Sequence, residues 1–547
     1  MKSHIIKFIT GILIITTIVS CKKKLEEFNP SGLTAESVFT TPEGFETLVN
    51  AAYTYQRWWY GKEEGYNIAE SGTDIWTSGS GDVYRDLTTY LNLQGGNAAL
   101  TNEWREFYAA VNLCNAGINR IDKAGLSAQL RNVREGELRF LRAFYYWHIV
   151  ETWGGVHFTT EETNGIISTA NKTPVDTFYA QIFRDLQYAV TNLPATQPNY
   201  GRVTKPAAQA FLARMYLTRN MNTEALQMAD AVIGNTTYKL ETNYADLWKM
   251  SNQKSKEVLY AINYAVNLSI NDLANGDLNP YGHSRGSNNG HLLFIMKYDD
   301  LPGMIRDLPN GRPFVRYMPS LFLLDLFSND DARYEASFQQ AYLASAPTRP
   351  AGMNLGDTAV LVTKYEIDNT FETTRKYRIY DRSKTYNADG TVKDNMHYPT
   401  LSKFLDPTRP NFNEAQSARD VFVIRLAEVY LIAAEASLNL SNAQKAADYI
   451  NILRTRAAKP GRVANMQVTA AQMSIDFILD ERARELAGEQ IRWFDLKRTG
   501  KLLSRVTANN PTNAVSIKPF HLLRPIPQTQ IDAVTNRDEF KQNEGYQ

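Results

Sequence analysis

A six-residue pattern, Leu-Ala-x-x-Tyr-Leu, occurs at 212–217 and again, far along the chain, at 426–431. The stretch 140–146 shares its Leu and its Tyr four residues later. The first two copies are each followed by a polar turn and a second amphipathic stretch, "TEALQMADAVI" and "AQKAADYINIL". Helix pairs with small residues between them are the stacking unit of tetratricopeptide-like proteins. Because the copies are so far apart, the pattern predicts an all-α scaffold of helix pairs that carries a large insertion.

Apolar spacing and helix-end signals divide the chain into regions. Thr41 followed by Pro42 predicts the first helix start, and a helical N-terminal region then extends over 41–235. No helical stripe follows Gly61 until about Gly96. The remainder, 240–547, is predicted to form one C-terminal region with three parts: loop-rich 240–420, helical 421–500 and a tail 501–547. Within the loop-rich part, "YRIYDRSKTYNADGTVK" predicts a hairpin around Asp389-Gly390.

Residues 1–20 are predicted to be a signal peptide. Lys2 and Lys7 precede an uncharged stretch from Phe8 to Ser20, which is too short to span a bilayer. The stretch ends in "IVSC", which resembles the lipobox of bacterial lipoproteins, so Cys21 is the predicted lipidation site and 21–40 an acylated tether. The alternative is a chance cysteine beside an ordinary cleavage site. Cys114 lies at helical spacing among apolar residues and is expected only to pack.

The composition and motifs argue against several classes of protein. Basic and acidic residues balance at 59 and 58, so a nucleic-acid partner is not expected. No His-Glu-x-x-His, Gly-x-Ser-x-Gly, P-loop or Gly-x-Gly-x-x-Gly motif occurs, and His283 and His291 lack metal-ligand spacing. We therefore expect no catalytic residue, metal or cofactor. A hydrolase remains the alternative, using one of the acidic pairs Glu63-Glu64, Asp299-Asp300 and Asp330-Asp331.

Aromatic residues make up 11% of the chain, and one cluster of them predicts a sugar-binding site. The segment 58–90 mixes Trp and Tyr with Gly, Ser, Thr and Asp, which together offer flat faces for stacking and acceptors for hydroxyl groups. The candidate ligand contacts here are Trp76, Asp74, Asp82, Tyr84, Trp58 and Tyr60. The alternative is that Trp58 or Trp59 closes the first helix and that Trp76 fills the interior of the scaffold.

The run 479–500, "LDERARELAGEQIRWFDLKRTG", interleaves opposite charges with large apolar side chains. Such a pattern indicates partly buried ion pairs that fix one helix end against its neighbours. A structural role is therefore predicted for this run.

Several stretches resemble the SusD/RagB family of outer-membrane nutrient-binding lipoproteins. They are "GELRFLRAFYYWHIVETWGGV", "NGRPFVRYMPSLFLLDLF", "RLAEVYLIAAEA", "ERARELAGEQIRWFDLKRTG" and "LRPIPQTQIDAVTNRDEFKQNEGY". The resemblance as a whole covers nearly the whole chain after the signal peptide. The ending "QNEGY" departs from the family's usual Asn-Pro-Gly-Tyr.

The resemblance implies a SusD-like fold and a glycan-binding lipoprotein without enzymatic activity. It implies an anchor in the outer membrane facing outward, consistent with the acidic pair in "KLEEF", and a SusC-like TonB-dependent barrel that receives the oligosaccharide. It also adds Tyr298 and Tyr317 as candidate ligand contacts. Peptide-binding members of the same family, a surface hydrolase and an exported scaffold that binds only protein are the alternatives.

Overall fold

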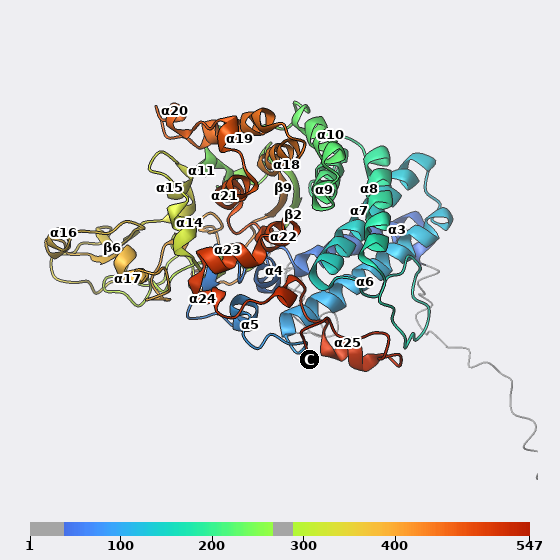
Figure 1. The fold of residues 1–547 in the computed structure, drawn as a ribbon, viewed down its shortest axis with the longest axis horizontal. Coiled ribbons are helices and arrows are strands. Elements are labelled where there is room, and N and C mark those ends of the chain that lie inside the picture. Colours follow the sequence, from blue (N-terminus) through green and yellow to red (C-terminus); the bar gives the residue numbers. More distant parts are fainter. Residues whose placement is uncertain (1–37, 266–287) are drawn as a thin grey trace, which may run out of the picture.

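The computed structural model describes residues 38–265 and 288–547, so the predicted signal peptide, Cys21 and His283 lie outside the described residues. Helices dominate the fold (Figure 1). The longer ones are α3 (Pro42–Thr54), α6 (Ala98–Arg120), α7 (Ala128–Trp153), α8 (Val175–Asn192), α9 (Lys205–Thr218), α10 (Asn222–Ile233), α18 (Leu426–Asn439), α19 (Ala443–Ala457), α21 (Ile475–Leu486) and α23 (Leu502–Asn509). The shorter ones are α4 (Glu63–Ala69), α5 (Arg85–Thr89), α11 (Tyr244–Leu247), α13 (Gly290–Leu293), α14 (Leu321–Asp325), α15 (Arg333–Ser337), α16 (Asn369–Thr373), α17 (Arg382–Thr385), α20 (Val463–Met466), α22 (Arg492–Arg498), α24 (Pro511–Ala514) and α25 (Gln528–Ala533).

The long helices stack in sequence order and the stack continues across the insertion. α6, α7, α8, α9 and α10 pack each on the next, and α10 then packs on α18, which packs on α19 (Figure 1). The repeated pattern explains the close packing, because Ala213 and Ala427 are fully buried beside Leu212 and Leu426. Small side chains at these positions allow helix axes to approach. The predicted all-α scaffold of tetratricopeptide-like helix pairs with a large loop-rich insertion is confirmed.

The helix start predicted at Thr41 is present, and two further helices begin with a capping side chain. The Thr41 side chain accepts a hydrogen bond from Gly44 N, and Ser127 and Asn97 cap α7 and α6 in the same way. These side chains satisfy amide groups that have no partner inside the helix. α7 ends at Trp153 and is followed by Gly154, whose φ of 75° favours glycine. No helix in the described part of the chain combines the length and apolar character needed to cross a membrane.

The strands are short and mostly join distant parts of the chain. Antiparallel pairs form between β1 (Trp76–Ser78) and β3 (Tyr317–Pro319), between β2 (Val258–Ile262) and β9 (Val421–Arg425), and between β4 (Phe338–Gln339) and β8 (Thr400–Leu401). A three-stranded sheet contains β5 (Ala341–Leu343), β6 (Thr358–Val362) and β7 (Arg378–Tyr380). This sheet lies in the lobe with α16 and α17, at the left of Figure 1.

Two local predictions need correction. The hairpin expected around Asp389-Gly390 is reduced to one bridge between Tyr386 and Val392, because β7 pairs in parallel with β6 instead. The turn itself is present, with Gly390 at a φ of 80°. The segment after Gly61 contains α4, although no helical stripe is visible there. α4 is buried on nearly all sides, so its sequence carries no amphipathic period.

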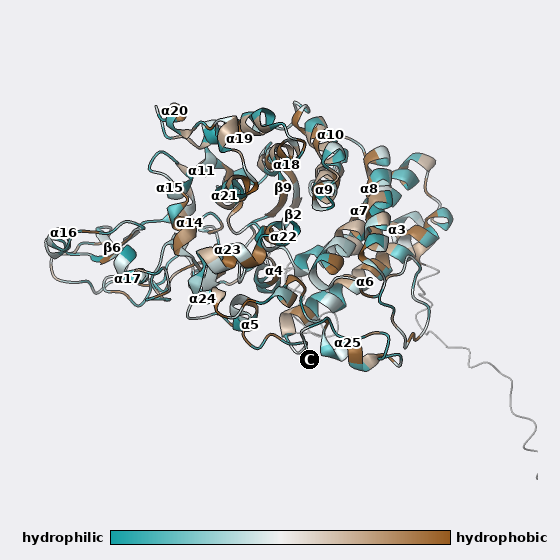
Figure 2. Cartoon of the chain, in the orientation of Figure 1, coloured by the Kyte–Doolittle hydropathy of each residue, from teal (hydrophilic) through white to brown (hydrophobic). Residues whose placement is uncertain are grey.

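Apolar side chains form two main cores. The larger one runs through the helix stack, and in Figure 2 brown residues gather where α18, α21, β2 and β9 face one another. The second lies under the loop-rich part and includes Trp76, Phe294, Tyr298 and Tyr317. Cys114 is buried in the first core as a free thiol, and burial raises its pKa, so the prediction that it only packs is confirmed.

The charges of 479–500 form buried ion pairs, which confirms the structural role predicted for them. Glu485 lies within 2.9 Å of guanidinium nitrogens of Arg333 and Arg425, and Arg456 also pairs with it. Glu481 pairs with Arg333 at 2.8 Å. Burial raises the pKa of these carboxyls, but the surrounding guanidinium groups outweigh it and lower both below their usual values. The network joins α15, β9, α19 and α21, so it fixes the loop-rich part against the helix stack.

Replacing Leu431 with Ala is expected to lower the free energy of unfolding by about 2–5 kcal/mol. Leu431 is fully buried in α18 between α10 and α19, so the substitution leaves a cavity where two helix pairs meet. Chemical denaturation measures the change. Ile452→Ala is the matched control, because Ile452 on α19 is 42% exposed. A Leu431→Ala variant as stable as this control would contradict the packing described here.

Candidate functional site

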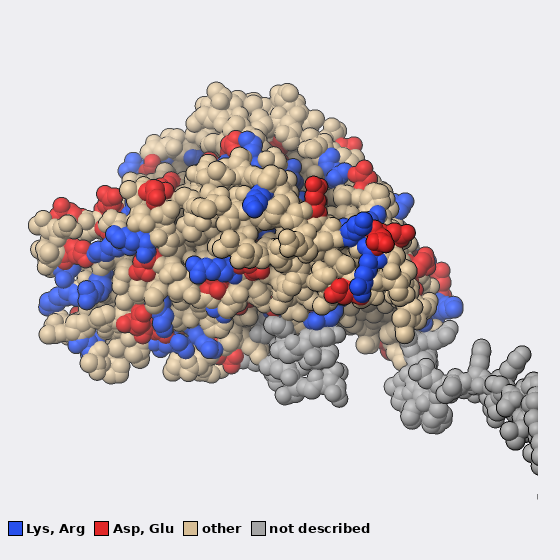
Figure 3. Space-filling view, turned by 60° about the horizontal axis from the view of Figure 1, so that its bottom comes forward, with Lys and Arg blue, Asp and Glu red and all other residues tan. Residues whose placement is uncertain are grey.

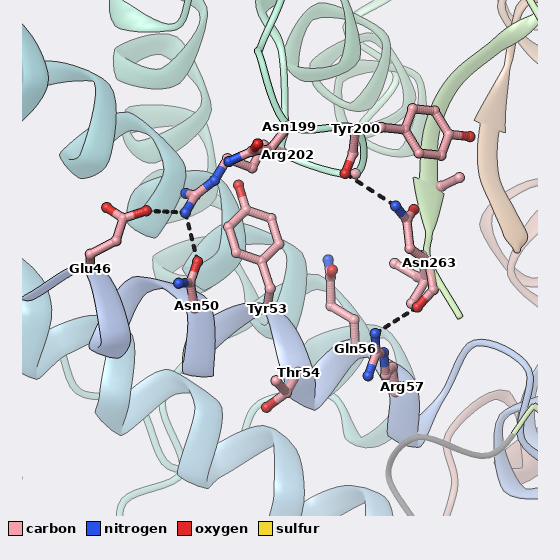
Figure 4. Close-up of a pocket in the computed structure, with 13 residues that line it drawn as sticks. Glu46, Asn50, Tyr53, Thr54, Gln56, Arg57, Asn199, Tyr200, Arg202 and Asn263 are labelled. Atoms are coloured by element: carbon pink, nitrogen blue, oxygen red, sulfur yellow. Dashed lines mark hydrogen bonds and ion pairs between the residues drawn. The ribbon is translucent and has the colours of Figure 1, made fainter. Parts of the chain in front are cut away.

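An open hollow of about 500 Å³ lies between α3, the loop 199–202 and the end of β2 (Figure 4). The amphipathic pattern of α3 produces one wall. Phe45, Leu48 and Val49 turn into the core, which leaves Glu46, Asn50 and Tyr53 on the side facing the hollow. The lining residues are Glu46, Asn50, Tyr53, Thr54, Gln56, Arg57, Asn199, Tyr200, Gly201, Arg202, Ala261, Ile262 and Asn263.

Hydrogen bonds between the three segments hold the walls in place. Arg202 forms an ion pair with Glu46 and donates to Asn50 Oδ1 at 2.6 Å, which ties the loop to α3. Asn263 Nδ2 donates to the Tyr200 carbonyl at 3.1 Å, and Arg57 Nη2 donates to the Asn263 carbonyl at 2.7 Å. Figure 4 shows these contacts around the rim. The hollow is therefore formed before any ligand binds, which reduces the entropy lost on binding.

Two buried polar atoms at the wall have no partner among the described residues. Gln56 is 1% exposed, and its Oε1 accepts a hydrogen bond from the Tyr260 hydroxyl at 2.7 Å, while its Nε2 has none. Asn263 Oδ1 is likewise unpaired. Figure 4 shows the Gln56 amide directed between Tyr53 and Asn263. Both atoms have almost no accessible surface, so they stiffen the wall of the hollow and do not face it. The polar side chains that line the hollow and keep accessible surface are Asn50, Thr54 and Arg57, which can donate to or accept from hydroxyl groups of a ligand.

Tyr200 supplies a flat apolar surface beside these groups. It is 37% exposed, its hydroxyl donates to the Gln253 carbonyl at 2.9 Å, and its backbone is held by Asn263. A tyrosine ring fixed at both ends and open on one face can stack against a sugar ring without losing much conformational freedom.

The structure places most of the predicted ligand contacts in the interior, which corrects the expectation that they face a ligand. Trp76 is fully buried, with its ring centroid 4.8 Å from that of Phe294. Trp58 is 1% and Tyr60 2% exposed, and both lie in the turns that follow α3. Tyr298 and Tyr317 are fully buried in the second core. Their sequence context is polar, but segments distant in the chain cover them.

Asp74 is also buried, and it serves as the anion of an ion-pair cluster. Its carboxylate lies 2.6 Å from Arg492 and 2.9 Å from Arg505. Burial raises the pKa of Asp74, but the two guanidinium groups outweigh burial and lower it below its usual value. A carboxylate with these partners has a structural role and does not face the hollow.

Asp82 and Tyr84 remain partly exposed, outside the hollow. Asp82 Oδ2 accepts hydrogen bonds from Ser78 Oγ at 2.7 Å and Thr88 Oγ1 at 2.6 Å, and burial raises the pKa of Asp82. A ligand role for Asp82 and Tyr84 stays a prediction.

The residues of the hollow carry no motif and come from three separated segments, so sequence reasoning missed them. The one available signal was the polar face of α3 opposite its apolar stripe.

The acidic pairs considered for a hydrolase are engaged in ion pairs. Glu63 lies 2.6 Å from Arg316, Asp299 lies 2.6 Å from Lys297, and Asp331 lies 2.7 Å from Arg333. Within residues 38–265 and 288–547, no group of His, Cys, Asp and Glu side chains has the arrangement of a metal site. On the face seen in Figure 3, basic and acidic residues are interspersed.

Comparisons with known proteins agree with this architecture. Residues 256–546 match the model of the SusD family, and residues 33–217 match a family model described as "Starch-binding associating with outer membrane". A "Laminarin binding SusD-like protein" structure has a TM-score of 0.70 at 21% identity, with 92% of this chain and 100% of that chain covered. "Surface glycan-binding protein A from Bacteroides thetaiotaomicron in complex with laminarihexaose" has a TM-score of 0.66 at 21% identity, with 92% and 99% covered.

Two curated relatives extend over much of the chain. The "SusD-like protein P25" of Formosa agariphila is 25% identical over 543 residues, which covers 96% of each chain. The "Starch-binding protein SusD" of Bacteroides thetaiotaomicron is 24% identical over 446 residues, covering 76% of this chain and 73% of that protein. The helix stack and its loop-rich insertion thus define a SusD-like binding scaffold. The chain belongs to the SusD family, whose members are binding proteins without catalytic activity.

Proposed function

We propose that this protein is a surface glycan-binding lipoprotein that captures an oligosaccharide in the hollow and passes it to a SusC-like TonB-dependent barrel in the outer membrane. The observation that carries the site is the open hollow itself, which is lined by the partly exposed ring of Tyr200 and by the polar side chains of Asn50 and Arg57. Relatives described as binding starch and laminarin support the ligand class.

Each part of the hollow has a task in this proposal. The Tyr200 ring stacks on the apolar face of a sugar, which excludes water from that face. One sugar hydroxyl hydrogen-bonds to the Asn50 side chain, and another accepts from the Arg57 guanidinium. These hydrogen bonds replace bonds to water, so each adds a modest amount to the affinity. No bond in the ligand is broken, and the protein holds the oligosaccharide until the barrel takes it.

Replacing Tyr200 with Ala is expected to weaken oligosaccharide binding at least about tenfold, roughly 1.4 kcal/mol. The melting temperature should stay nearly unchanged, because the ring is partly exposed and lies on a loop. Affinity electrophoresis across a panel of polysaccharides finds a ligand, and calorimetry then compares the variants. Tyr365→Ala is the matched control, since Tyr365 is 43% exposed and lies in the loop-rich part. Equal losses in both variants, or none in Tyr200→Ala, would contradict the assignment of the site.

Replacing Cys21 with Ala is expected to release the protein from the outer membrane in an unacylated form. The reason is the apolar stretch that ends in "IVSC" and the affinity that each acyl methylene adds for the bilayer, about 0.8 kcal/mol. Mass spectrometry of the mature N-terminus and membrane fractionation measure the outcome. An acylated Cys21→Ala protein that still sediments with the outer membrane would rule out Cys21 as the anchor.

A further inference from the structure

A second hollow of about 250 Å³ adjoins the first on the other side of the Tyr200 loop. Both hollows are lined by the loop 199–202 and by Ala261 of β2. The second adds Lys254, Lys256 and Tyr238. We call the two hollows together the β2 groove. Tyr200 lies between its halves, so a ligand stacked on that ring extends into both, and the groove suits a chain of several sugars.

The charges that line the β2 groove are predominantly positive. Arg202 is neutralised, because it pairs with Glu46 and with Glu137. Arg57, Lys254 and Lys256 have no carboxylate oxygen within 4.0 Å in the described part of the chain, and Glu46 is the acidic residue that lines the groove. Arg57 lies 5.3 Å from the centre of the Tyr264 ring, and Lys254 Nζ lies 5.1 Å from that of Tyr200.

The carboxyl group of Asp420 interacts electrostatically with Lys254 and Arg57. Burial raises the pKa of Asp420 to about 6, and Lys254 and Arg57 lower it in part. Its Oδ1 accepts a hydrogen bond from Tyr264 N at 2.9 Å, and it forms no ion pair with either cation. Asp420 is therefore bound to the backbone, and Arg57 and Lys254 line the groove without a carboxylate partner among the described residues.

We propose that the β2 groove selects an extended glycan that carries anionic groups, either uronate carboxylates or sulfate esters. This inference rests on the proposed function and specifies its ligand class. The Arg57 guanidinium can bind a carboxylate or sulfate through two parallel hydrogen bonds, and the lysines add attraction at the far end. A chain in contact with the Tyr200 ring places charged substituents near both ends of the groove.

The test compares each anionic glycan with its neutral counterpart. Oligogalacturonate is paired with its methyl ester, and a sulfated galactan with the same galactan after desulfation. We expect an acidic form to bind at least tenfold more tightly than its neutral form, and the difference to shrink between 50 and 500 mM NaCl as salt screens the charges. The pair that shows the difference tells a uronate ligand from a sulfated one.

Variants assign the effect to the groove. Arg57→Gln with Lys254→Gln should remove the preference for the acidic form and leave the melting temperature nearly unchanged. Lys541→Gln is the matched control, because Lys541 is exposed and lies in the tail after α25. Equal affinity for acidic and neutral forms would overturn this inference and leave the proposed function standing, provided Tyr200→Ala still weakens binding. Binding that is insensitive to Tyr200→Ala would overturn the proposed site, and failure to bind either acidic probe would overturn the anionic selection.

Discussion

Replacing Arg333 with Met is expected to lower the free energy of unfolding by about 3–5 kcal/mol. Arg333 is fully buried and lies 2.7 Å from Asp331 and 2.8 Å from both Glu481 and Glu485. Its removal leaves these carboxylates buried with fewer positive partners, and a buried charge without a partner is strongly destabilising. Urea denaturation at pH 7 measures the change.

The pH dependence distinguishes lost ion pairs from lost packing. The folded-state pKa values of Glu481 and Glu485 are lowered, so these carboxylates stabilise the fold above their unfolded pKa of about 4.3, and this contribution falls as the pH drops below it. The difference between parent and Arg333→Met should therefore shrink from pH 7 to pH 3. Arg462→Met is the control, since Arg462 pairs with Asp330 at 3.4 Å but its side chain is 59% exposed. An Arg333 variant as stable as this control would contradict the buried network.

Replacing Trp76 with Ala is expected to lower the free energy of unfolding by about 3–5 kcal/mol while the folded fraction keeps its affinity for glycan. The Trp76 ring is fully buried against Phe294, and its backbone pairs with Pro319 across β1 and β3. Truncation opens a large cavity in the second core. The measurements are chemical denaturation and a binding titration well below the unfolding temperature.

A neighbouring residue provides the control for Trp76. Val83→Ala should change stability by less than about 0.5 kcal/mol, because Val83 is 58% exposed. If Trp76→Ala abolished binding without loss of stability, the ring would belong to a ligand site and the burial described here would be wrong.

The helix stack was predictable from the sequence, because the spacing of apolar residues along a helix indicates which of its faces is buried. Leu212 with Ala213, and Leu426 with Ala427, occur in the same six-residue pattern. The helical spacing within this pattern indicates a helix face that packs on a neighbouring helix. The ion pairs of 479–500 were predictable for the same reason. Charges placed between large apolar residues within one helix turn cannot all reach water.

The site was not predictable, because exposure in the loop-rich part depends on distant segments. Trp76 lies among Gly, Ser and Asp, yet it is covered by α13 and β3, more than 200 residues along the chain. Tyr200 lies in an ordinary loop, and it becomes part of a site only because α3 and β2 form the adjacent walls. Local composition identifies residues that could bind a sugar, whereas the tertiary fold decides which of them are exposed.

A structure of the protein with a bound oligosaccharide tests the central claim most directly. Our account predicts a sugar ring against Tyr200, with hydroxyl oxygens within hydrogen-bond distance of the Asn50 and Arg57 side chains. Electron density for the oligosaccharide beside Asp82 and Tyr84, with the hollow free of sugar, would contradict it.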